Sequence, residues 1–337
     1  MTLHKTASPL RRGLPIVALC FVTMVAAVLA APFIGSTPIR AREVFSPTVA
    51  FADNVDAQIF FIARLPRALA AALVGGALAA AGVVFQGLLR NPLATPYTLG
   101  VSAGAALGAM LAITFGASWP VVGSVELASL TGALVAVFVV YLLATARQQG
   151  LSSTVLLLAG VTLNAFFSAL ILFVQYASDY AQIFRALRWL MGDLDVVSYR
   201  PILSALPLVA IAFAGFAFLA RPLNLLALGA DAAGTRGVDI ERAQRIAFLG
   251  GSLATGAAVS VGGPIGFVGI IVPHLVRLVV GADHRLVLPA STFFGAAFLV
   301  VCDMIARTVI APIELPVGVV TAVIGGPFFL WLLLGKR

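Results

Sequence analysis

The sequence predicts an all-α polytopic membrane protein with about ten transmembrane helices. The first observation is composition: of the 337 residues, 61% are hydrophobic and 10% are charged, whereas a soluble domain carries about 25% charged residues. The second is that apolar runs of about 20 residues recur along the chain, which is the length a helix needs to cross the hydrocarbon core. A membrane β-barrel would show short alternating segments instead. We therefore expect one transmembrane domain, residues 14–337, after a polar cytoplasmic tail, residues 1–13.

The first five spans are predicted from consecutive apolar runs. The run at 14–34 follows a basic tail and contains several small residues, so it also fits a cleaved signal peptide. Its length suits a span, and we take it as the first helix. A polar loop follows at 35–66. The next four spans are expected at 67–89, 99–115, 121–144 and 154–176.

The second half begins with a polar loop that contains the sequence IFRALRWLMG, residues 183–192. The mixture of apolar and basic residues predicts a short interfacial helix, with Trp189 at the depth of the lipid headgroups. Further apolar runs predict the remaining spans at 201–220, 242–259, 267–280, 286–305 and 317–334.

The distribution of positive charge predicts the orientation. With the N-terminus in the cytoplasm, 13 of the 21 Lys and Arg residues fall in cytoplasmic segments and 8 in outer ones, as the positive-inside rule requires. Ten spans then place both termini in the cytoplasm, together with the polar stretch at 221–245. The net charge of +8 is explained by loop residues, and no basic run is interleaved with aromatics, so we do not expect nucleic-acid binding.

The stretch at 221–245, RPLNLLALGADAAGTRGVDIERAQR, interrupts the apolar chain but has the pattern of folded structure. Leu225, Leu226 and Leu228 cluster on one short helical segment, which Gly229 ends. A second segment begins after this glycine, and Gly237 is placed to end it as a C-cap. A flexible linker would be rich in Ser, Gly and Lys instead. We therefore expect an ordered element outside the membrane.

A second irregular segment, SVGGPIGFVG, occupies residues 260–269 and precedes a short apolar run. Its Gly262, Gly263, Pro264 and Gly266 are too closely spaced for a regular helix. Irregular backbone at membrane depth survives only where protein or water satisfies its polar groups, and it often marks a transport pathway or a moving joint. The alternative interpretation is a tight connection between two spans.

Several kinds of chemistry are not expected. The sequence has no G-x-x-x-x-G-K-[ST] loop for binding ATP, and no constellation of a nucleophile with a base. Cys20 and Cys302 lie in separate apolar runs, which favours two small buried side chains over a disulfide. The histidines His4, His274 and His284 are scattered, so we expect no metal site.

Two acids, Glu126 and Asp303, fall within or near apolar runs. Buried acids in membranes often relay protons, but both lie near the outer ends of their predicted helices. Arg307 follows Asp303 by four residues, which is the spacing of an ion pair on one helix face. We therefore expect structural pairing of these two residues rather than proton coupling.

Two further groups of residues have open interpretations. In the fifth span, Asn164 and Ser168 are neutral polar groups beside Phe167, which suits passage of a bulky solute or, alternatively, helix–helix packing. At the outer side, Arg64 and Arg67 flank the start of the second span, and Arg307 ends the ninth. They could bind an acidic protein partner or anchor lipid headgroups.

Six segments together resemble the FecCD-type permeases, the membrane subunits of type II ABC importers for ferric siderophores, haem and cobalamin. They are LPRALAAALVGGALAAAGVVFQGLLRNPLATPYTLGVSAGA (65–105), LLLAGVTLNAFFSAL (156–170), RWLMGDLDVVSYRP (188–201), LNLLALGADAAGTRGVD (223–239), GGPIGFVGIIVPHLVRLVVGADHR (262–285) and ELPVGVVTAVIGGPFFLWLL (314–333). The matches follow the family's order over nearly the whole chain.

The resemblance implies a type II ABC importer permease fold in a bacterial inner membrane. It implies as partners a second copy of the chain, two cytoplasmic ATPase subunits that bind ATP and Mg, and a periplasmic substrate-binding protein, within membrane lipid. This chain itself would bind no cofactor. The expected cargo is an iron chelate, either a ferric siderophore or haem, with cobalamin as the alternative. A more remote alternative, an ion-coupled secondary transporter, predicts titratable residues at the membrane midplane, and the sequence offers none.

The resemblance also implies roles for particular residues. The outer arginines Arg64, Arg67 and Arg307 match positions that meet acidic residues of the binding protein. The pathway at the dimer axis matches the fifth span, with Asn164, Phe167, Ser168 and Leu172. The segment 221–241 matches the helices that rest in a groove of the ATPase, and its contact residues would be Leu225, Leu226, Leu228, Gly229, Ala230, Asp231, Gly234 and Arg236. We expect its three leucines to be exposed to water when that partner is absent.

Overall fold

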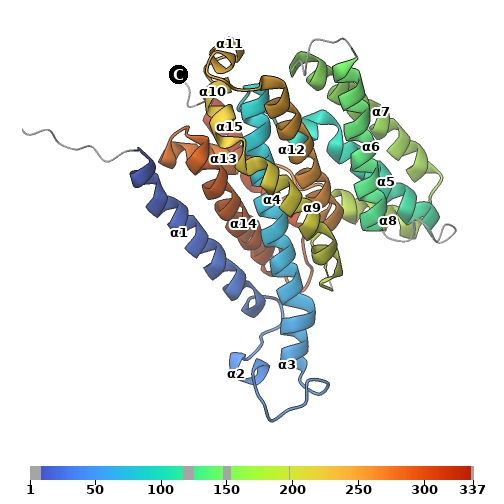
Figure 1. Ribbon diagram of the computed structural model, residues 1–337. Helices are drawn as coiled ribbons and strands as arrows, with labels where there is room; N and C mark the ends of the chain where they lie inside the picture. Colours follow the sequence, from blue (N-terminus) through green and yellow to red (C-terminus); the bar gives the residue numbers. More distant parts are fainter. Residues whose placement is uncertain (1–8, 117–124, 147–152, 197, 335–337) are drawn as a thin grey trace, which may run out of the picture.

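The computed structural model describes residues 9–116, 125–146, 153–196 and 198–334 (Figure 1). These residues are nearly all helical and contain no β-strand, which confirms the predicted all-α fold class. The first half of the chain forms helices α1 (Pro9–Ala30), α2 (Ala41–Val44), α3 (Val55–Gln58), α4 (Leu65–Leu89), α5 (Val101–Phe115), α6 (Val125–Thr145) and α7 (Ser153–Tyr176). The second half forms α8 (Tyr180–Leu190), α9 (Arg200–Ala217), α10 (Ala220–Leu226), α11 (Ala230–Gly234), α12 (Ile240–Gly262), α13 (Val268–Val280), α14 (His284–Thr308) and α15 (Val317–Leu334).

Ten helices correspond to the ten predicted spans. Among the described residues, seven helical segments are long and apolar enough to cross a membrane. The other three are the shorter apolar helices α5, α13 and α15. A short helix is also present at the segment predicted to be interfacial: α8, whose N-terminus is capped by a reciprocal capping box of Asp179 and Gln182.

The largest differences from the predicted boundaries are in the first and second spans. Helix α1 begins at Pro9 and not at residue 14, so part of the expected tail is helical, and residues 1–8 lie outside the described residues. The second span is longer than predicted: α3, the π-helix Ile59–Arg64 and α4 form one continuous stretch, Val55–Leu89, of 35 residues. The helix passes through Pro66 because proline follows the π-helical turn at the start of α4, where its missing N–H is tolerated.

Helix α4 lies at the centre of the bundle, between α14 and α12 (Figure 1), and 83% of its most apolar window is buried. Small residues allow this close packing. A Cβ on Gly75 would lie 2.3 Å from the carbonyl oxygen of Gly295 in α14, and one on Gly82 would lie 2.0 Å from the carbonyl oxygen of Gly269 in α13. The helix backbones therefore touch, as is common where small residues line membrane helices.

A second group, α5 to α8, packs beside α12 (Figure 1). Its helices also approach through small residues, since a Cβ on Gly108 of α5 would lie 2.1 Å from the carbonyl oxygen of Ala128 in α6. Before α5 the chain turns back into the interior as the 3₁₀ helix Pro96–Leu99. A Cβ on Gly160 of α7 would lie 2.2 Å from the carbonyl oxygen of Thr98, so α7 packs directly on this turn.

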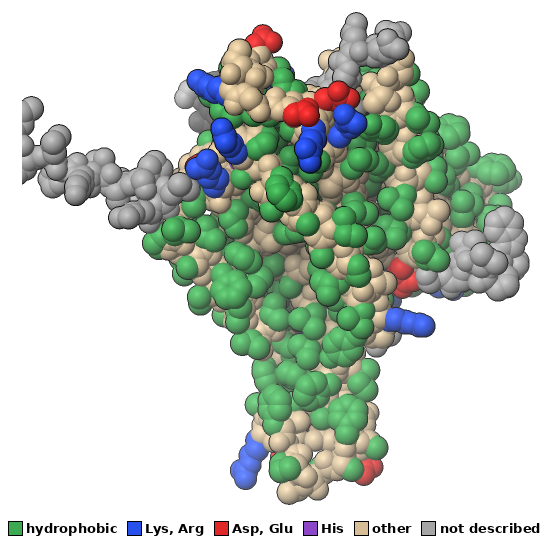
Figure 2. Space-filling view, viewed as in Figure 1, with side chains coloured by type: hydrophobic (Ala, Val, Ile, Leu, Met, Phe, Trp, Pro, Cys, Tyr) green, Lys and Arg blue, Asp and Glu red, His purple; other side chains and the backbone are tan. Residues whose placement is uncertain are grey.

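The bundle has two ends of different character. We call them the α10–α11 end and the α2–α3 end, after the short helices that lie there (Figure 1). Figure 2 shows charged side chains gathered at the α10–α11 end, above a broad belt of apolar side chains. A belt of this kind is what lipid would solvate, and it agrees with the composition of the chain.

Candidate functional site

The segment 221–241 forms the predicted pair of short helices. Helix α10 ends before Gly229, whose φ of +114° breaks the helical path, and α11 follows directly. The amide of Val238 donates to the carbonyl of Ala233 at 3.1 Å, and the amide of Gly237 donates to that of Gly234 at 3.0 Å. With Gly237 at φ +79°, these bonds form a Schellman C-cap, which confirms the predicted role of this glycine.

The three leucines of this segment do not form one exposed patch, which corrects the prediction. Leu226 is only 4% exposed and packs with Leu223 into the main core, whereas Leu228 is 64% exposed and Leu225 is half-buried. The split arises because Leu223 and Leu226 lie three residues apart on the inward face of α10, while Leu228 lies beyond its end. The exposed surface of the pair is completed by Asp231, Gly234 and Arg236, with Gly229 and Ala230 half-buried beside them.

Asn224 connects this helix pair to the start of α14. Its side-chain Nδ2 donates to Oδ1 of Asp283 at 2.6 Å, and its side-chain Oδ1 accepts from the backbone N–H of His284 at 2.9 Å. Burial alone would raise the pKa of Asp283, but hydrogen bonds from the Arg285 amide and from Asn224 outweigh it, so the pKa lies below its usual value. The sequence prediction missed this contact because Asn224 and Asp283 are 59 residues apart.

The irregular segment is shorter than predicted. Helix α12 continues to Gly262, so residues 260–262 are helical and the irregular backbone covers 263–267. Gly263 has φ +66°, and a Cβ there would lie 2.4 Å from the carbonyl oxygen of Trp189, so this position requires glycine. Pro264 follows it. A Cβ on Gly266 would meet no heavy atom of the described residues within 4 Å, so packing does not require a glycine there.

Phe267 holds the segment in an unusual conformation. Its φ is +67°, a left-handed value that is rare for an aromatic residue. A Cβ on Gly325 of α15 would lie 2.4 Å from Cγ of this ring, so α15 makes room for it. Local strain of this kind persists only where the surrounding structure enforces it, and it is common at sites of conformational change.

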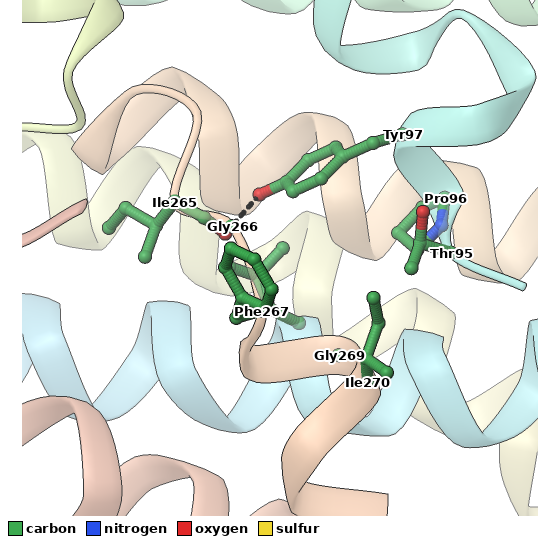
Figure 3. A pocket seen from close by; sticks show the side chains of 9 residues that line it. Thr95, Pro96, Tyr97, Ile265, Gly266, Phe267, Gly269 and Ile270 are labelled. Carbon is green, nitrogen blue, oxygen red and sulfur yellow. Dashed lines mark hydrogen bonds between the residues drawn. The ribbon is translucent and has the colours of Figure 1, made fainter. Parts of the chain in front are cut away.

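The irregular segment faces the 3₁₀ turn before α5 across a small apolar pocket of about 220 Å³ (Figure 3). The Tyr97 hydroxyl donates to the carbonyl of Ile265 at 2.7 Å and so satisfies one of the backbone groups freed by the irregular path. Asn164 of α7 in turn donates to the carbonyl of Tyr97 at 3.0 Å. These two bonds connect α7, the turn and the irregular segment.

The predicted pathway residues of α7 do not share one environment. Phe167 is only 8% exposed, and Asn164 is half-buried against the turn. Ser168 is exposed and Leu172 is 65% exposed, so they face away from this chain. Because Asn164, Ser168 and Leu172 are spaced four residues apart, they form one stripe along the helix. Phe167 lies beside this stripe and packs inward.

The buried arginines at the α2–α3 end form a charge cluster with two carboxylates, the buried Asp303 and the exposed Glu314. Arg67 pairs with Asp303 at 2.8 Å and with Glu314, and Arg307 pairs with the other oxygen of Asp303 at 3.0 Å. Arg64 donates to the backbone carbonyls of residues 32 and 37. The predicted pairing of Asp303 with Arg307 is thus confirmed. The pairing of Asp303 with Arg67 was not predicted, because these residues are 236 positions apart.

The three arginines that were predicted to dock a binding protein are buried and not on the outer surface. Arg64 and Arg67 are each 6% exposed and Arg307 is 3% exposed, so their guanidinium groups are neither free surface cations nor headgroup anchors. They line a cleft of about 960 Å³ together with Arg188, Asp195 and other residues. A partner would have to insert an acidic side chain into this cleft. Contact of these arginines with a binding protein stays a prediction.

The ten apolar helices, the irregular segment and the exposed helix pair together define a helical membrane transport subunit. Residues 22–335 match the FecCD transport family, and the chain belongs to this family of ABC transporter permeases. It is 46% identical over 274 residues to the cobalamin import system permease BtuC of Halobacterium salinarum, covering 81% of this chain and 73% of that protein. It is 41% identical over 277 residues to the hemin transport system permease HmuU of Yersinia pestis, covering 81% and 82%.

Two further comparisons agree. The chain is 39% identical over 296 residues to the ABC transporter permease YvrB of Bacillus subtilis, covering 87% of this chain and 83% of that protein. A solved structure described as an inward-facing ABC transporter of the metal-chelate type superposes with a TM-score of 0.80 at 31% identity, covering 96% of this chain and 99% of that one. The predicted family and the permease fold are therefore confirmed.

Proposed function

We propose that this chain is the permease subunit of an ABC importer that moves an iron chelate, a ferric siderophore or haem, across the bacterial inner membrane. The observation that carries the proposal is the exposed helix pair α10–α11. Its Leu228, Asp231 and Arg236 are not covered by any other described part of the chain, in a protein whose sequence has no ATP-binding loop. The pair is ordered by its own C-cap and by core leucines, although its outer side is exposed. An ordered, exposed surface can bind a partner without first having to fold.

The proposed orientation places the α10–α11 end, with both termini, in the cytoplasm. Two ATPase subunits that bind ATP and Mg dock on the helix pairs of two copies of the chain. A periplasmic binding protein delivers the substrate to the α2–α3 end. The stripe Asn164–Ser168–Leu172 on α7 then faces the second copy and lines the pathway, which fits its exposure in the single chain.

Movement of the pathway follows from packing on small residues. Helices that touch through Gly and Ala can slide with little loss of contact, because few side chains interdigitate. The irregular backbone at 263–267, held by Tyr97, gives the bundle a joint between α12 and α13. We therefore propose that closure of the ATPases moves α10–α11 and changes which end of the pathway is open.

An ion-coupled secondary transporter is less well supported. Such a protein needs an ionisable group near the middle of a span. Among the described spans, the acids Asp56, Glu126 and Glu241 lie in first turns, and Asp303 is ion-paired near the end of α14. None of these positions suits a proton or sodium relay at the midplane.

The ATPase contact can be tested by co-expression with tagged ABC ATPase subunits encoded in the same genome. We expect Leu228→Asp to abolish co-purification without changing thermal stability, because the side chain is exposed in this chain. The matched control is Val309→Asp, since this side chain is 60% exposed just after α14, at the other end of the bundle. The control is expected to co-purify normally. Undiminished co-purification of Leu228→Asp would refute the proposed docking surface.

The substrate can be tested in proteoliposomes that contain the complete importer. Ferrichrome, haemin and cyanocobalamin are supplied separately with Mg-ATP inside the vesicles, and accumulation is measured for each. We expect uptake of ferrichrome or haemin. Uptake of cyanocobalamin alone would replace the iron chelate by cobalamin as cargo, and gradient-driven uptake without ATP would support a secondary transporter instead.

A further inference from the structure

Helix α14 joins the two ends of the bundle. It begins at His284 beside α10 and carries Asp303 and Arg307 of the charge cluster near its other end. Its 25 residues span about 37 Å at 1.5 Å per residue. Pro289 removes one backbone donor near the start, yet the helix continues without interruption.

At the α10–α11 end, the contact of α10 with α14 is directional. The side-chain Oδ1 of Asn224 accepts a hydrogen bond from the backbone N–H of His284. This N–H is one of the first-turn donors of α14 that lack a partner within the helix. It also lies 2.7 Å from Nδ1 of the His284 ring. The Asn224 amide donates to Asp283, which caps α14 by accepting from the amide of Arg285 at 3.0 Å.

At the α2–α3 end, α14 is fixed to α4. The Arg67–Asp303 ion pair is buried, and the backbones of Gly75 and Gly295 are in contact midway along the two helices. The buried ion pair is costly to separate, so Arg67 and Asp303 move together, whereas the glycine contact lets the two helices slide past each other. Because α14 is one continuous helix, a displacement at its start reaches the charge cluster.

We propose that Asn224 is the positioning residue that transmits displacement of α10 to α14, and through α14 to the charge cluster at the α2–α3 end. This inference rests on the proposed function, since the ATPase supplies the displacement. Leu223 and Leu226 also hold α10 against the core, but apolar contacts are non-directional and permit sliding. The Asn224 hydrogen bonds depend on distance and angle. When α10 moves, α14 must therefore move with it, or these bonds break.

The test uses the complete importer with its ATPase subunit in lipid nanodiscs. A spin label at Val309→Cys reports on the far end of α14, in a background with Cys20→Ala and Cys302→Ala. In the parent protein we expect Mg-ATP to change the spectrum of this label, and an unchanged spectrum would overturn the inference. We expect Asn224→Ala to keep ATPase binding and basal hydrolysis within about twofold, but to abolish the response at position 309. Substrate moved per ATP should fall about tenfold, which corresponds to about 1.4 kcal/mol of lost coupling.

Two further variants complete the design. Asp283→Ala removes the other half of the contact and is expected to behave as Asn224→Ala does. Arg245→Ala breaks the exposed Arg245–Glu241 pair, 3.1 Å, at the same end of the bundle without touching α14, and is expected to change none of the readouts.

The outcomes separate this inference from the proposed function. A normal response at position 309 in Asn224→Ala overturns the inference, and so does loss of ATPase binding in both Asn224→Ala and Asp283→Ala, because the contact would then serve assembly alone. Failure of the parent chain to bind an ATPase subunit overturns the proposed function itself.

Discussion

Removing the carboxylate of Asp303 is predicted to destabilise the protein strongly. Asp303 is fully buried and pairs with Arg67 and Arg307, so Asp303→Ala leaves two buried guanidinium groups with Glu314 as their remaining carboxylate. With Arg64, the cluster carries three positive and two negative side chains, and the variant raises its net charge from +1 to +2. Removal of one partner from a buried ion pair costs about 3–5 kcal/mol, which is the loss of unfolding free energy that we expect.

The chain offers a matched control for this variant. Arg245 and Glu241 form an ion pair with the same four-residue spacing at 3.1 Å, but their side chains are 48% and 64% exposed. Glu241→Ala should therefore lose less than about 0.5 kcal/mol. The assay is reversible unfolding in mixed micelles, followed by circular dichroism. Equal losses for the two variants would refute the argument that burial determines the cost.

A double variant sharpens the same prediction. Combining Asp303→Leu with Arg307→Leu returns the net charge of the cluster to +1 and leaves Arg67 paired with Glu314. We expect the double variant to lose at least about 1 kcal/mol less than the sum of the two single variants, as coupled neighbours do. Strict additivity would mean that the two groups do not interact.

Three further predictions concern packing, the irregular segment and pH. Gly75→Leu should lose more than about 2 kcal/mol of unfolding free energy in the same assay, because even its Cβ would lie 2.3 Å from the Gly295 carbonyl oxygen. Tyr97→Phe should lose about 1 kcal/mol and raise hydrogen exchange around Ile265, whose carbonyl would lose its 2.7 Å bond; unchanged exchange would contradict this. The pKa of Asp283 is lower in the folded protein than in the unfolded chain, where it is 3.8. Its contribution to the free energy of unfolding should therefore be present above pH 3.8 and be lost as the pH falls through the folded pKa. Asp283→Asn should flatten the plot of unfolding free energy against pH in that range.

The sequence was sufficient to predict the features that depend on local pattern. The ten spans follow from apolar runs of the length that a membrane requires, and the break at Gly229 and the C-cap at Gly237 follow from turn chemistry. The ion pair of Asp303 with Arg307 was predictable because both residues lie on one helix, four positions apart.

Contacts between distant segments were beyond the sequence argument. Arg67 was assigned to the outer surface because a cation at the end of a span usually faces water or headgroups. Its true environment depends on Asp303 and Glu314, which lie 236 and 247 residues away. The same holds for Asn224 with Asp283, since nothing in the composition of either segment specifies its partner.

Burial of apolar residues was also ambiguous, because in a membrane protein hydrophobicity does not distinguish the interior from the lipid face. In the apolar 18-residue stretch of each span, 83% is buried in the span that contains α4, 28% in α7 and 6% in α1. All three stretches are strongly apolar. What distinguishes α4 is its content of Gly and Ala, which permits close helix packing on all sides. The exposed face of α7 carries polar Ser168 beside Asn164, whereas the exposed hydroxyl on α1, that of Thr23, donates to the Cys20 carbonyl of its own helix at 2.8 Å; lipid is a poor solvent for polar groups that are not bonded in this way. This difference is why we assign α7, and not α1, to the face that a second copy covers.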